Sequence, residues 1–343
     1  MKLKFGMLQV AGIVAVGLST QLSAQAPPSP SQPLPTRSDF KNPLGAAVPK
    51  PAAPDLLKEA REAVGKRQFD RARELFAAVV RADPTNRDAA LEYADTFYAE
   101  DRYEESLVEF GKVADAFPRF DKVYHWRGDA YRNLKRFAEA ESDYTRALEL
   151  SPKSSIYLLE RAKVRAEQGR HADAIVDVSV ALRLTKLDDM RAQLLTARAG
   201  FSQRRGDADS ALADFVAAAN LEPENAGYLN AAAWQLATSP SPERRNAALA
   251  LEWATRACAL TKYENPNYLD TLAAVCAENE QFEQAVALQQ TAIELASEAA
   301  RPAMASRLEM YREKRPLSSR PSDPNENEKT PPAAPSAPEP PQP

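Results

Sequence analysis

The stretch from Asp121 to Ser154 reads DKVYHWRGDAYRNLKRFAEAESDYTRALELSPKS and has the pattern of two short amphipathic helices. Apolar or small residues recur at spacings of three and four within each half, as on one face of a helix. The polar residues 133–136 separate the two halves. Pro152 follows the second half, and because proline cannot continue a helix, the second helix is expected to stop near residue 150.

The small residues of this stretch indicate where the two helices cross. Gly128 in the first half and Ala140 in the second have almost no side chain, which lets two helix backbones approach closely. Aromatic rings are then needed to fill the space around the crossing. The stretch supplies three of them, at Tyr131, Phe137 and Tyr144.

The proline that closes the stretch recurs with a fixed period. Pro84, Pro118 and Pro152 are equally spaced along the chain, and small and aromatic residues recur with them. This pattern resembles the tetratricopeptide repeat family, whose unit is a helix–turn–helix of about 34 residues. The resemblance implies an all-α fold, a right-handed α-solenoid of about seven helical hairpins with a C-terminal capping helix. Since this fold carries many functions, it predicts a class of activity and not a partner.

The expected solenoid occupies residues 55–314. Its units are expected to form one continuous array, because each exposes an apolar face that only its neighbours bury. Two units depart from the pattern. In the fourth, Lys186 replaces the closing proline, so its second helix is expected to run on, and in the sixth a Ser/Pro-rich insertion lengthens the turn after Thr238. The units are expected at 53–86, 87–120, 121–154, 155–188, 192–225, 226–264 and 266–297, with a capping helix at 298–314.

Proline marks the segments on either side of the solenoid. Of the 27 prolines, nine lie between Pro27 and Pro54 and ten between Pro316 and Pro343. These segments contain few large apolar residues to bury, so they favour extended, solvated chain over a packed core. Residues 27–54 are therefore predicted to be a Pro-rich disordered linker, and residues 315–343 a Pro-rich disordered tail.

The first 26 residues are typical of a bacterial signal peptide. A basic start (Lys2, Lys4) precedes an apolar run over residues 10–18, and small residues at Ala24 and Ala26 fit cleavage after Ala26. The run is too short to span a membrane comfortably. We therefore expect an exported protein, periplasmic or extracellular, with no stable membrane insertion after cleavage. An uncleaved N-terminal anchor is the alternative.

Composition argues against several classes of function. The net charge of −4 gives no case for nucleic acid as a partner. The chain has only two histidines, and no catalytic constellation, metal-ligand spacing or Gly-rich phosphate loop, so we expect no enzyme, no metal and no cofactor. Its many acidic residues are interpreted as solvated charge on helix faces. Cys258 and Cys276 fall on neighbouring helices, where they either form a disulfide or are small buried residues.

The resemblance also implies a binding surface, because in this family the first helices line an inner, concave groove. The mapped surface includes Arg61, Asp88, Leu91, Asp95, Leu159 and Asn230. The peptide-groove candidates are Tyr98, Lys122, His125, Asp129, Arg132, Asn133, Lys163 and Trp234.

The groove candidates combine cations with aromatic rings, which could hold an extended peptide bearing carboxylates. An ordinary solvated face is the alternative. Trp234 either points into the groove or lies under the loop 239–246. The Asn/Lys clamp of co-chaperone members of the family is not reproduced, since Trp126 stands where a basic residue is expected.

These observations predict a non-catalytic scaffold that binds a protein or peptide in the concave groove. The alternative is a structural or assembly subunit of a bacterial envelope complex, which would act through the convex face and the tails.

Overall fold

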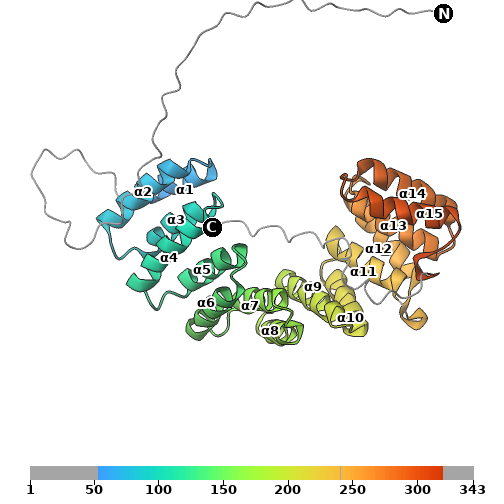
Figure 1. Cartoon of the computed structure of the whole chain (residues 1–343), viewed down its shortest axis with the longest axis horizontal. Coiled ribbons are helices and arrows are strands. Elements are labelled where there is room, and N and C mark those ends of the chain that lie inside the picture. Colours follow the sequence, from blue (N-terminus) through green and yellow to red (C-terminus); the bar gives the residue numbers. More distant parts are fainter. Residues whose placement is uncertain (1–52, 240, 320–343) are drawn as a thin grey trace, which may run out of the picture. The chain divides into compact units, whose positions relative to one another are not determined.

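The computed structural model describes residues 53–239 and 241–319, which are almost entirely helical (Figure 1). None of these described residues forms a strand. Two short 3-10 turns, η1 (Pro242–Arg244) and η2 (Leu317–Ser319), accompany the α-helices. The α-helices are α1 (Ala53–Gly65), α2 (Phe69–Ala82), α3 (Arg87–Tyr98), α4 (Tyr103–Ala116), α5 (Asp121–Asn133), α6 (Phe137–Leu150), α7 (Ser155–Glu167), α8 (His171–Leu184), α9 (Asp188–Arg204), α10 (Ala208–Leu221), α11 (Ala226–Thr238), α12 (Ala247–Leu260), α13 (Pro266–Glu278), α14 (Phe282–Leu295) and α15 (Arg301–Arg312).

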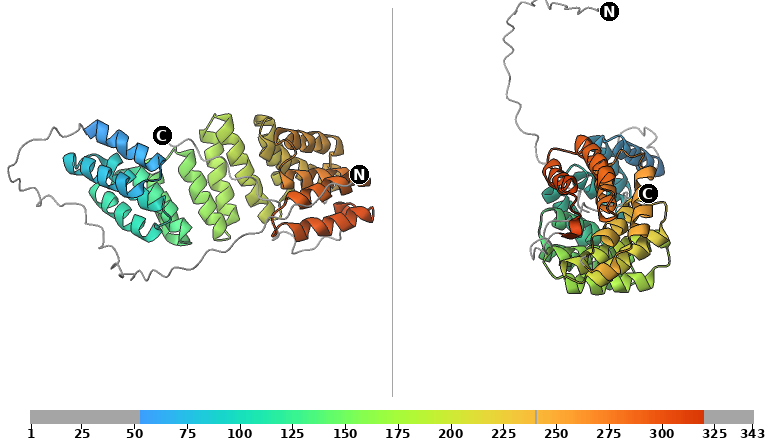
Figure 2. Two further views of the ribbon diagram at one scale, coloured as in Figure 1. Left: turned by 90° about the horizontal axis from the view of Figure 1, so that it is seen from above. Right: turned by 90° about the vertical axis from the view of Figure 1, so that its right-hand side faces the viewer.

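The first fourteen of these helices pair into seven hairpins, numbered one (α1–α2) to seven (α13–α14). Each first helix packs on the second helix of its own hairpin, and each second helix packs on the first helix of the next. Figures 1 and 2 show the hairpins following one another in chain order, with α15 against hairpin seven. The predicted all-α fold, a right-handed α-solenoid of seven helical hairpins with a C-terminal capping helix, is confirmed.

The helix crossing of hairpin three has the geometry that its small residues predict. A Cβ added to Gly128 would lie 2.8 Å from Cε1 of Tyr144, so only glycine leaves room for this ring. Tyr144 and Ala140 are fully buried. The cluster at this crossing contains Ala140, Tyr144 and Val164, with Tyr131 and Phe137 packed against it.

Six of the seven hairpin turns share one backbone feature. The residue two positions before the second helix has a positive φ, between 55° and 80°, which turns the chain back on itself. This left-handed conformation carries no steric cost for glycine but does for residues with a Cβ. The six residues are Arg67, Asp101, Lys135, Gly169, Gly206 and Glu280.

Hairpins four and five differ from the sequence prediction at their junction. The second helix of hairpin four does not run on: α8 ends at Leu184, and Thr185 is extended, with φ −100° and ψ 145°. The next helix begins early instead, so α9 spans 17 residues from Asp188. The additional residues therefore extend the first helix of hairpin five and not the second helix of hairpin four.

The long turn of hairpin six is fixed by hydrogen bonds. The amide of Asn246 donates to the carbonyl of Leu236 at 3.2 Å, and Nε of Arg245 donates to the carbonyl of Ser239 at 2.7 Å. The side chain of Asn246 then caps α12 by accepting from the amide of Leu249 at 3.0 Å. The insertion thus forms a loop that leaves both helices of the hairpin intact.

Helix α13 is buried on every side, which sets the C-terminal end of the array apart. All residues from Tyr268 to Ala277 are buried, as expected for a helix enclosed by α11, α12, α14 and η2. Asp270 within it accepts two hydrogen bonds from Arg307 of α15, at 2.8 and 2.7 Å, and one from Gln289 of α14 at 2.7 Å. This buried polar contact joins the capping helix to hairpin seven.

Residues 317–319 (η2), which the sequence assigned to the tail, pack back on α13. The amide of Ser318 donates to Oε1 of Glu278 at 2.8 Å, and Leu317 packs against the C-terminal core. The predicted signal peptide (1–26), the linker up to residue 52 and residues 320–343 lie outside the described residues. No helix in the described part of the chain has both the length and the apolar character needed to cross a membrane.

Candidate functional site

Seven of the eight candidate residues lie on three successive first helices. Tyr98 is on α3, Lys163 is on α7, and the remaining five are on α5. We call the surface that they form with their neighbours the central face. It consists of Asp95, Tyr98, Lys122, His125, Trp126, Asp129, Arg132, Asn133, Glu160 and Lys163.

Tyr98 and Asn133 join the first two helices of the central face. Nδ2 of Asn133 donates to the hydroxyl oxygen of Tyr98 at 2.7 Å. The Tyr98 ring lies edge-on to Tyr103 and Trp126, with centroid separations of 5.3 and 6.5 Å. These contacts hold an aromatic group at the junction of hairpins two and three.

The carboxylate of Asp129 is largely enclosed, since its side chain is 20% exposed. The hydroxyl of Tyr144 donates to its Oδ1 at 2.5 Å, and Nε2 of His125 lies 3.6 Å from its Oδ2. Burial raises the pKa of Asp129, an effect that His125 partly offsets. The candidates His125 and Asp129 are therefore neighbours, as the sequence spacing of four residues predicts.

Asp95 is a carboxyl group of the central face for which the described residues provide no ion-pair partner. It lies on α3 and is partly buried. Burial, followed by repulsion from Glu92 and Asp129, raises the pKa of Asp95 to about 7. A carboxyl group with such a pKa changes its charge near neutral pH.

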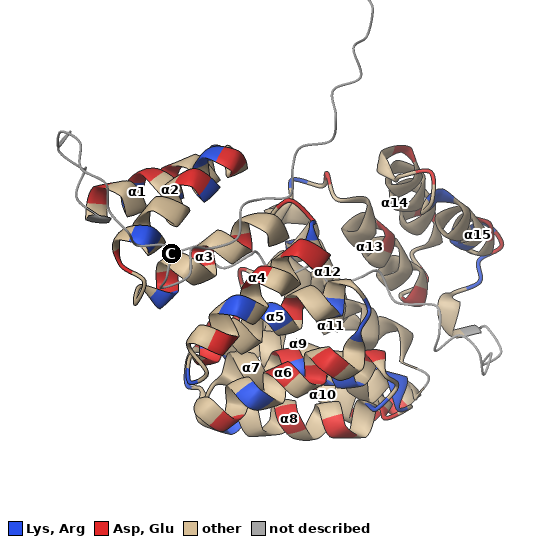
Figure 3. Cartoon of the chain, turned by 60° about the vertical axis from the view of Figure 1, so that its left-hand side comes forward, with Lys and Arg blue, Asp and Glu red and all other residues tan. Residues whose placement is uncertain are grey.

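The cations of the central face are already paired with carboxylates. Nη1 of Arg132 and Nζ of Lys163 contact Glu160 at 2.8 and 2.7 Å. Lys122 lies 3.8 Å from Asp88. Figure 3 shows the same mixture of basic and acidic residues over the helices of this region. The expectation that these three cations stand ready for an acidic peptide is therefore not supported, because each already has a carboxylate partner.

Trp234 is part of a different cluster. It lies on α11, where its partly buried ring packs against the C-terminal core that includes α13. It is not among the groups that contact one another on the central face. Its neighbour Asn230 is only 5% exposed, with Oδ1 unpaired among the described groups.

A series of ion pairs that the sequence did not predict joins the two helices of a hairpin. In hairpins three, four and five an arginine of the first helix donates two hydrogen bonds to a buried aspartate of the second, at 2.7–2.9 Å. These aspartates are not solvated charges, since their side chains are only 4–9% exposed. The pairs are Arg127–Asp143, Arg161–Asp177 and Arg198–Asp214.

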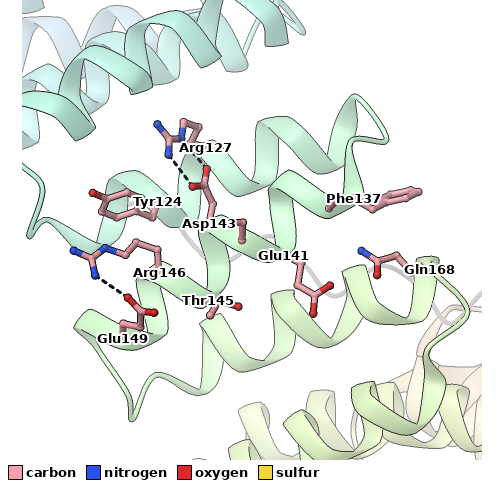
Figure 4. A pocket seen from close by; sticks show the side chains of 11 residues that line it. Tyr124, Arg127, Phe137, Glu141, Asp143, Thr145, Arg146, Glu149 and Gln168 are labelled. Carbon is pink, nitrogen blue, oxygen red and sulfur yellow. Dashed lines mark hydrogen bonds and ion pairs between the residues drawn. The ribbon is translucent and has the colours of Figure 1, made fainter.

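A cavity of about 830 Å³ opens beside α6 (Figure 4). The charged residues that line it are all paired: Arg127 with Asp143, and Arg146 with Glu149, as the dashed lines show. Glu141 in turn accepts hydrogen bonds from two arginines of hairpin four. The cavity therefore offers no unpaired charge to a ligand, and we assign these residues to packing between hairpins.

Both cysteines are buried and free. Burial raises the pKa of the Cys258 thiol to about 12 and that of Cys276 to about 11, which keeps both protonated. The structure thus favours the alternative of two small buried residues over a disulfide. Within residues 53–239 and 241–319, no cluster of three or more His, Cys, Asp or Glu side chains could hold a metal ion.

Comparison with known proteins agrees with this architecture. Two models of the tetratricopeptide repeat family match the chain, one at residues 57–119 and one at residues 121–154. No curated protein matches.

Several solved structures are similar to parts of the chain. A tetratricopeptide repeat protein from Parabacteroides merdae has 15% identity and a TM-score of 0.48, and the match covers 76% of this chain and 98% of that one. A thermophilic TPR protein of Thermus thermophilus has 21% identity and a TM-score of 0.44, with 54% and 99% covered. YrrB, a TPR protein with an unusual peptide-binding site, has 17% identity and a TM-score of 0.43, with 55% and 92% covered.

Hairpins one to three of this chain are tetratricopeptide repeats. The family matches cover hairpins one to three, and the remaining hairpins repeat the same packing of each helix on the next. Proteins of this family are generally non-catalytic scaffolds, so the fold suggests a role in protein–protein interaction.

Proposed function

We propose that this chain is a non-catalytic scaffold that binds an extended protein or peptide segment on the central face. The supporting observation is that three successive first helices bring polar and aromatic side chains together on one surface. Its cross-helix contacts, such as Asn133 with Tyr98 and Arg132 with Glu160, hold these side chains in fixed positions. A surface ordered before binding loses less side-chain entropy when a partner docks.

The C-terminal hairpins are less suited to this role. Helix α13 is enclosed by its neighbours and by residues 317–319, so hairpin seven has no open first-helix surface. Trp234 of hairpin six packs against the same core. The binding surface is therefore assigned to α3, α5 and α7, and Trp234 is left out of it.

Site-specific crosslinking tests this assignment. A photoreactive phenylalanine analogue replaces either Asn133, an exposed residue of the central face, or Val176, which is 60% exposed on the second helix α8. We expect crosslinks to a partner segment from position 133 and not from position 176 in the cells that make the protein. The proposal is wrong if position 176 captures the partner and position 133 does not.

Capture of the partner by position 176 and not by position 133 would support a structural subunit that acts through its second helices. Val108 and Val176 favour this candidate, because they are 59% and 60% exposed and occupy the same position in hairpins two and four. Large apolar side chains in solvent are common, but the repetition defines a surface worth testing. Changing both to Glu should abolish assembly if this candidate is right, and leave partner binding intact if the central face is used.

We also propose that the protein is exported, on the basis of the sequence of its first 26 residues. The test is the N-terminus of the chain isolated from the envelope fraction. Mass spectrometry should find Pro27 as the first residue. An N-terminus at Met1 in a membrane fraction would favour the uncleaved anchor, and the same N-terminus in the cytosol would end the export proposal.

A further inference from the structure

We propose that the segment bound on the central face is basic, with an arginine or lysine side chain of the partner placed between Asp95 and Asp129. This inference rests on the proposed function and specifies its partner. The charge of this partner is opposite to that of the acidic peptide suggested by the sequence alone.

The cations on and beside the central face have no unpaired charge to offer. Glu160 takes both Arg132 and Lys163, at 2.8 and 2.7 Å. Lys122 lies 3.8 Å from its neighbour Asp88. Arg61 of hairpin one is paired with Glu92 through two hydrogen bonds, at 2.9 and 2.6 Å. An acidic peptide would have to compete with an existing carboxylate at each of these cations.

Among the described residues, two carboxylates of the central face form no ion pair with a lysine or an arginine. Asp95 has no ion-pair partner among the described residues, and Asp129 contacts the hydroxyl of Tyr144 and the ring of His125, with the charge of Arg132 acting on it as well. The two occupy the same position in successive hairpins, on the first helices α3 and α5, which contact each other, and their charges repel. Placing a cation between them would relieve this repulsion and favour the charged form of both groups.

Aromatic rings stand beside this pair of carboxylates. Tyr98, one helical turn after Asp95, and Trp126, which precedes Asp129, are partly exposed and lie edge-on to each other at 6.5 Å. The hydrogen bond from Asn133 fixes the Tyr98 hydroxyl. A guanidinium or ammonium group binds carboxylates and also stacks on aromatic faces, whereas a carboxylate ligand does neither. The surface therefore complements a basic side chain in both charge and ring content.

Selection from a random peptide library displayed on phage tests the inference, with the full chain as the immobilised target. Asp95→Asn removes the unpaired carboxylate, and Asp115→Asn, at an exposed residue of the second helix α4, is the charge-matched control. We expect selected peptides to be enriched in Arg or Lys at one position. Their affinity should fall roughly tenfold or more for Asp95→Asn, as for loss of a charged hydrogen bond, and stay unchanged for Asp115→Asn.

The alternative results separate this inference from the function on which it rests. Selected peptides that are acidic or uncharged, and whose binding is unaffected by Asp95→Asn but lost on Trp126→Ala, would overturn the basic partner and keep the central face as a binding site. Selection of no peptide, or of peptides insensitive to both changes, would overturn the proposed function and the inference with it. Circular dichroism melting of each variant confirms that it is folded.

Discussion

Arg198 and Asp214 form a bidentate ion pair that holds the two helices of hairpin five together. Nε donates to Oδ2 and Nη2 to Oδ1, both at 2.7 Å, while Nη1 donates to Oγ of Ser179 in the preceding hairpin at 3.2 Å. Arg161 of hairpin four likewise reaches Thr145 of hairpin three at 3.3 Å. One guanidinium group thus connects a hairpin internally and also joins it to its neighbour.

Removing the acid of this pair should destabilise the protein strongly. In Asp214→Ala the guanidinium of Arg198, whose side chain is only 29% exposed, loses its partner without regaining full solvation. Breaking a largely buried pair from one side costs about 3 kcal/mol or more. The measurement is the midpoint of urea unfolding followed by circular dichroism.

Two further variants show whether the cost comes from the unpaired charge. Replacing both partners, in Arg198→Met with Asp214→Leu, should recover most of the lost stability. Glu149→Ala breaks an exposed pair with Arg146 and should change the free energy of unfolding by about 0.5 kcal/mol or less. If the double variant is as unstable as Asp214→Ala, lost packing and not the stranded charge is responsible.

Replacing Glu109 of hairpin two should increase the stability of the protein, unlike the replacement of Asp214. It lies one repeat period before Asp143, at the position of the paired aspartates, but Tyr93 occupies the place of the arginine. Its side chain is 10% exposed, Oε1 contacts Lys112, and Oε2 has no partner. Glu109→Met removes a buried acceptor, so we expect a gain of about 1 kcal/mol in urea unfolding. The exposed control Glu104→Met should be neutral, and a loss of stability in Glu109→Met would contradict this reasoning.

The sequence contained the signal for these ion pairs, but the usual helical spacings do not show it. Arg127 and Arg161 are separated by one repeat period, as are Asp143 and Asp177, so these charges recur in step with the closing prolines. Each arginine is 16 residues from its aspartate, a separation that brings two residues together only once the hairpin has folded. Apolar periodicity was enough to predict the hairpins, whereas the polar contacts within them required the crossing geometry.

For the central face, the repeat period predicts which residues share a surface but not which of their charges are paired. Groove positions recur with the repeat period, which placed Asp95 and Asp129 on one surface from sequence alone. The pairing of Arg132 with Glu160 joins residues 28 positions apart on different first helices. It depends on the reach of flexible side chains across neighbouring hairpins, which a repeat period does not specify. The repeat period alone therefore does not show which cations of the surface are paired.

Three glycines should respond differently to the same substitution by alanine. Gly128→Ala places a Cβ 2.8 Å from Tyr144 and should cost about 1–3 kcal/mol through overpacking. Gly169→Ala meets no atom within 4 Å but has φ +77°, so it should cost about 1 kcal/mol through backbone strain. Gly111→Ala, in open space within α4, should add about 0.5–1 kcal/mol through helix propensity. Equal effects at all three positions in thermal unfolding would contradict the crossing and turn geometry.

Lys135→Gly should stabilise the turn of hairpin three. Lys135 has φ +58°, a conformation that costs a residue with a Cβ roughly 1 kcal/mol and glycine almost nothing. Part of this gain is offset because glycine makes the unfolded chain more flexible. We therefore expect a net increase of about 0.5 kcal/mol in chemical unfolding. The matched control is Lys153→Gly, at an exposed residue outside the positive-φ set, which should gain nothing.

Asp95 should make stability depend on pH in the direction opposite to a salt-bridged aspartate. Its pKa is about 7 in the folded protein and near 3.8 when unfolded, so between these values the folded state holds a proton that the unfolded state has released. Stability therefore falls as pH rises from about 4 to 7, and Asp95→Asn removes this loss. We expect the variant to melt roughly 2–4 °C higher than the natural protein at pH 8, the shift that about 1 kcal/mol gives at this size.

The same comparison at lower pH isolates the cause. Near pH 4 Asp95 is protonated in the folded protein, so the advantage of Asp95→Asn should shrink towards zero, while the exposed control Asp115→Asn should show no such trend. An advantage that stays constant from pH 4 to pH 8 would mean that Asp95 is solvated and ionised throughout. The cation site proposed between Asp95 and Asp129 would then lose the desolvated carboxylate on which it depends.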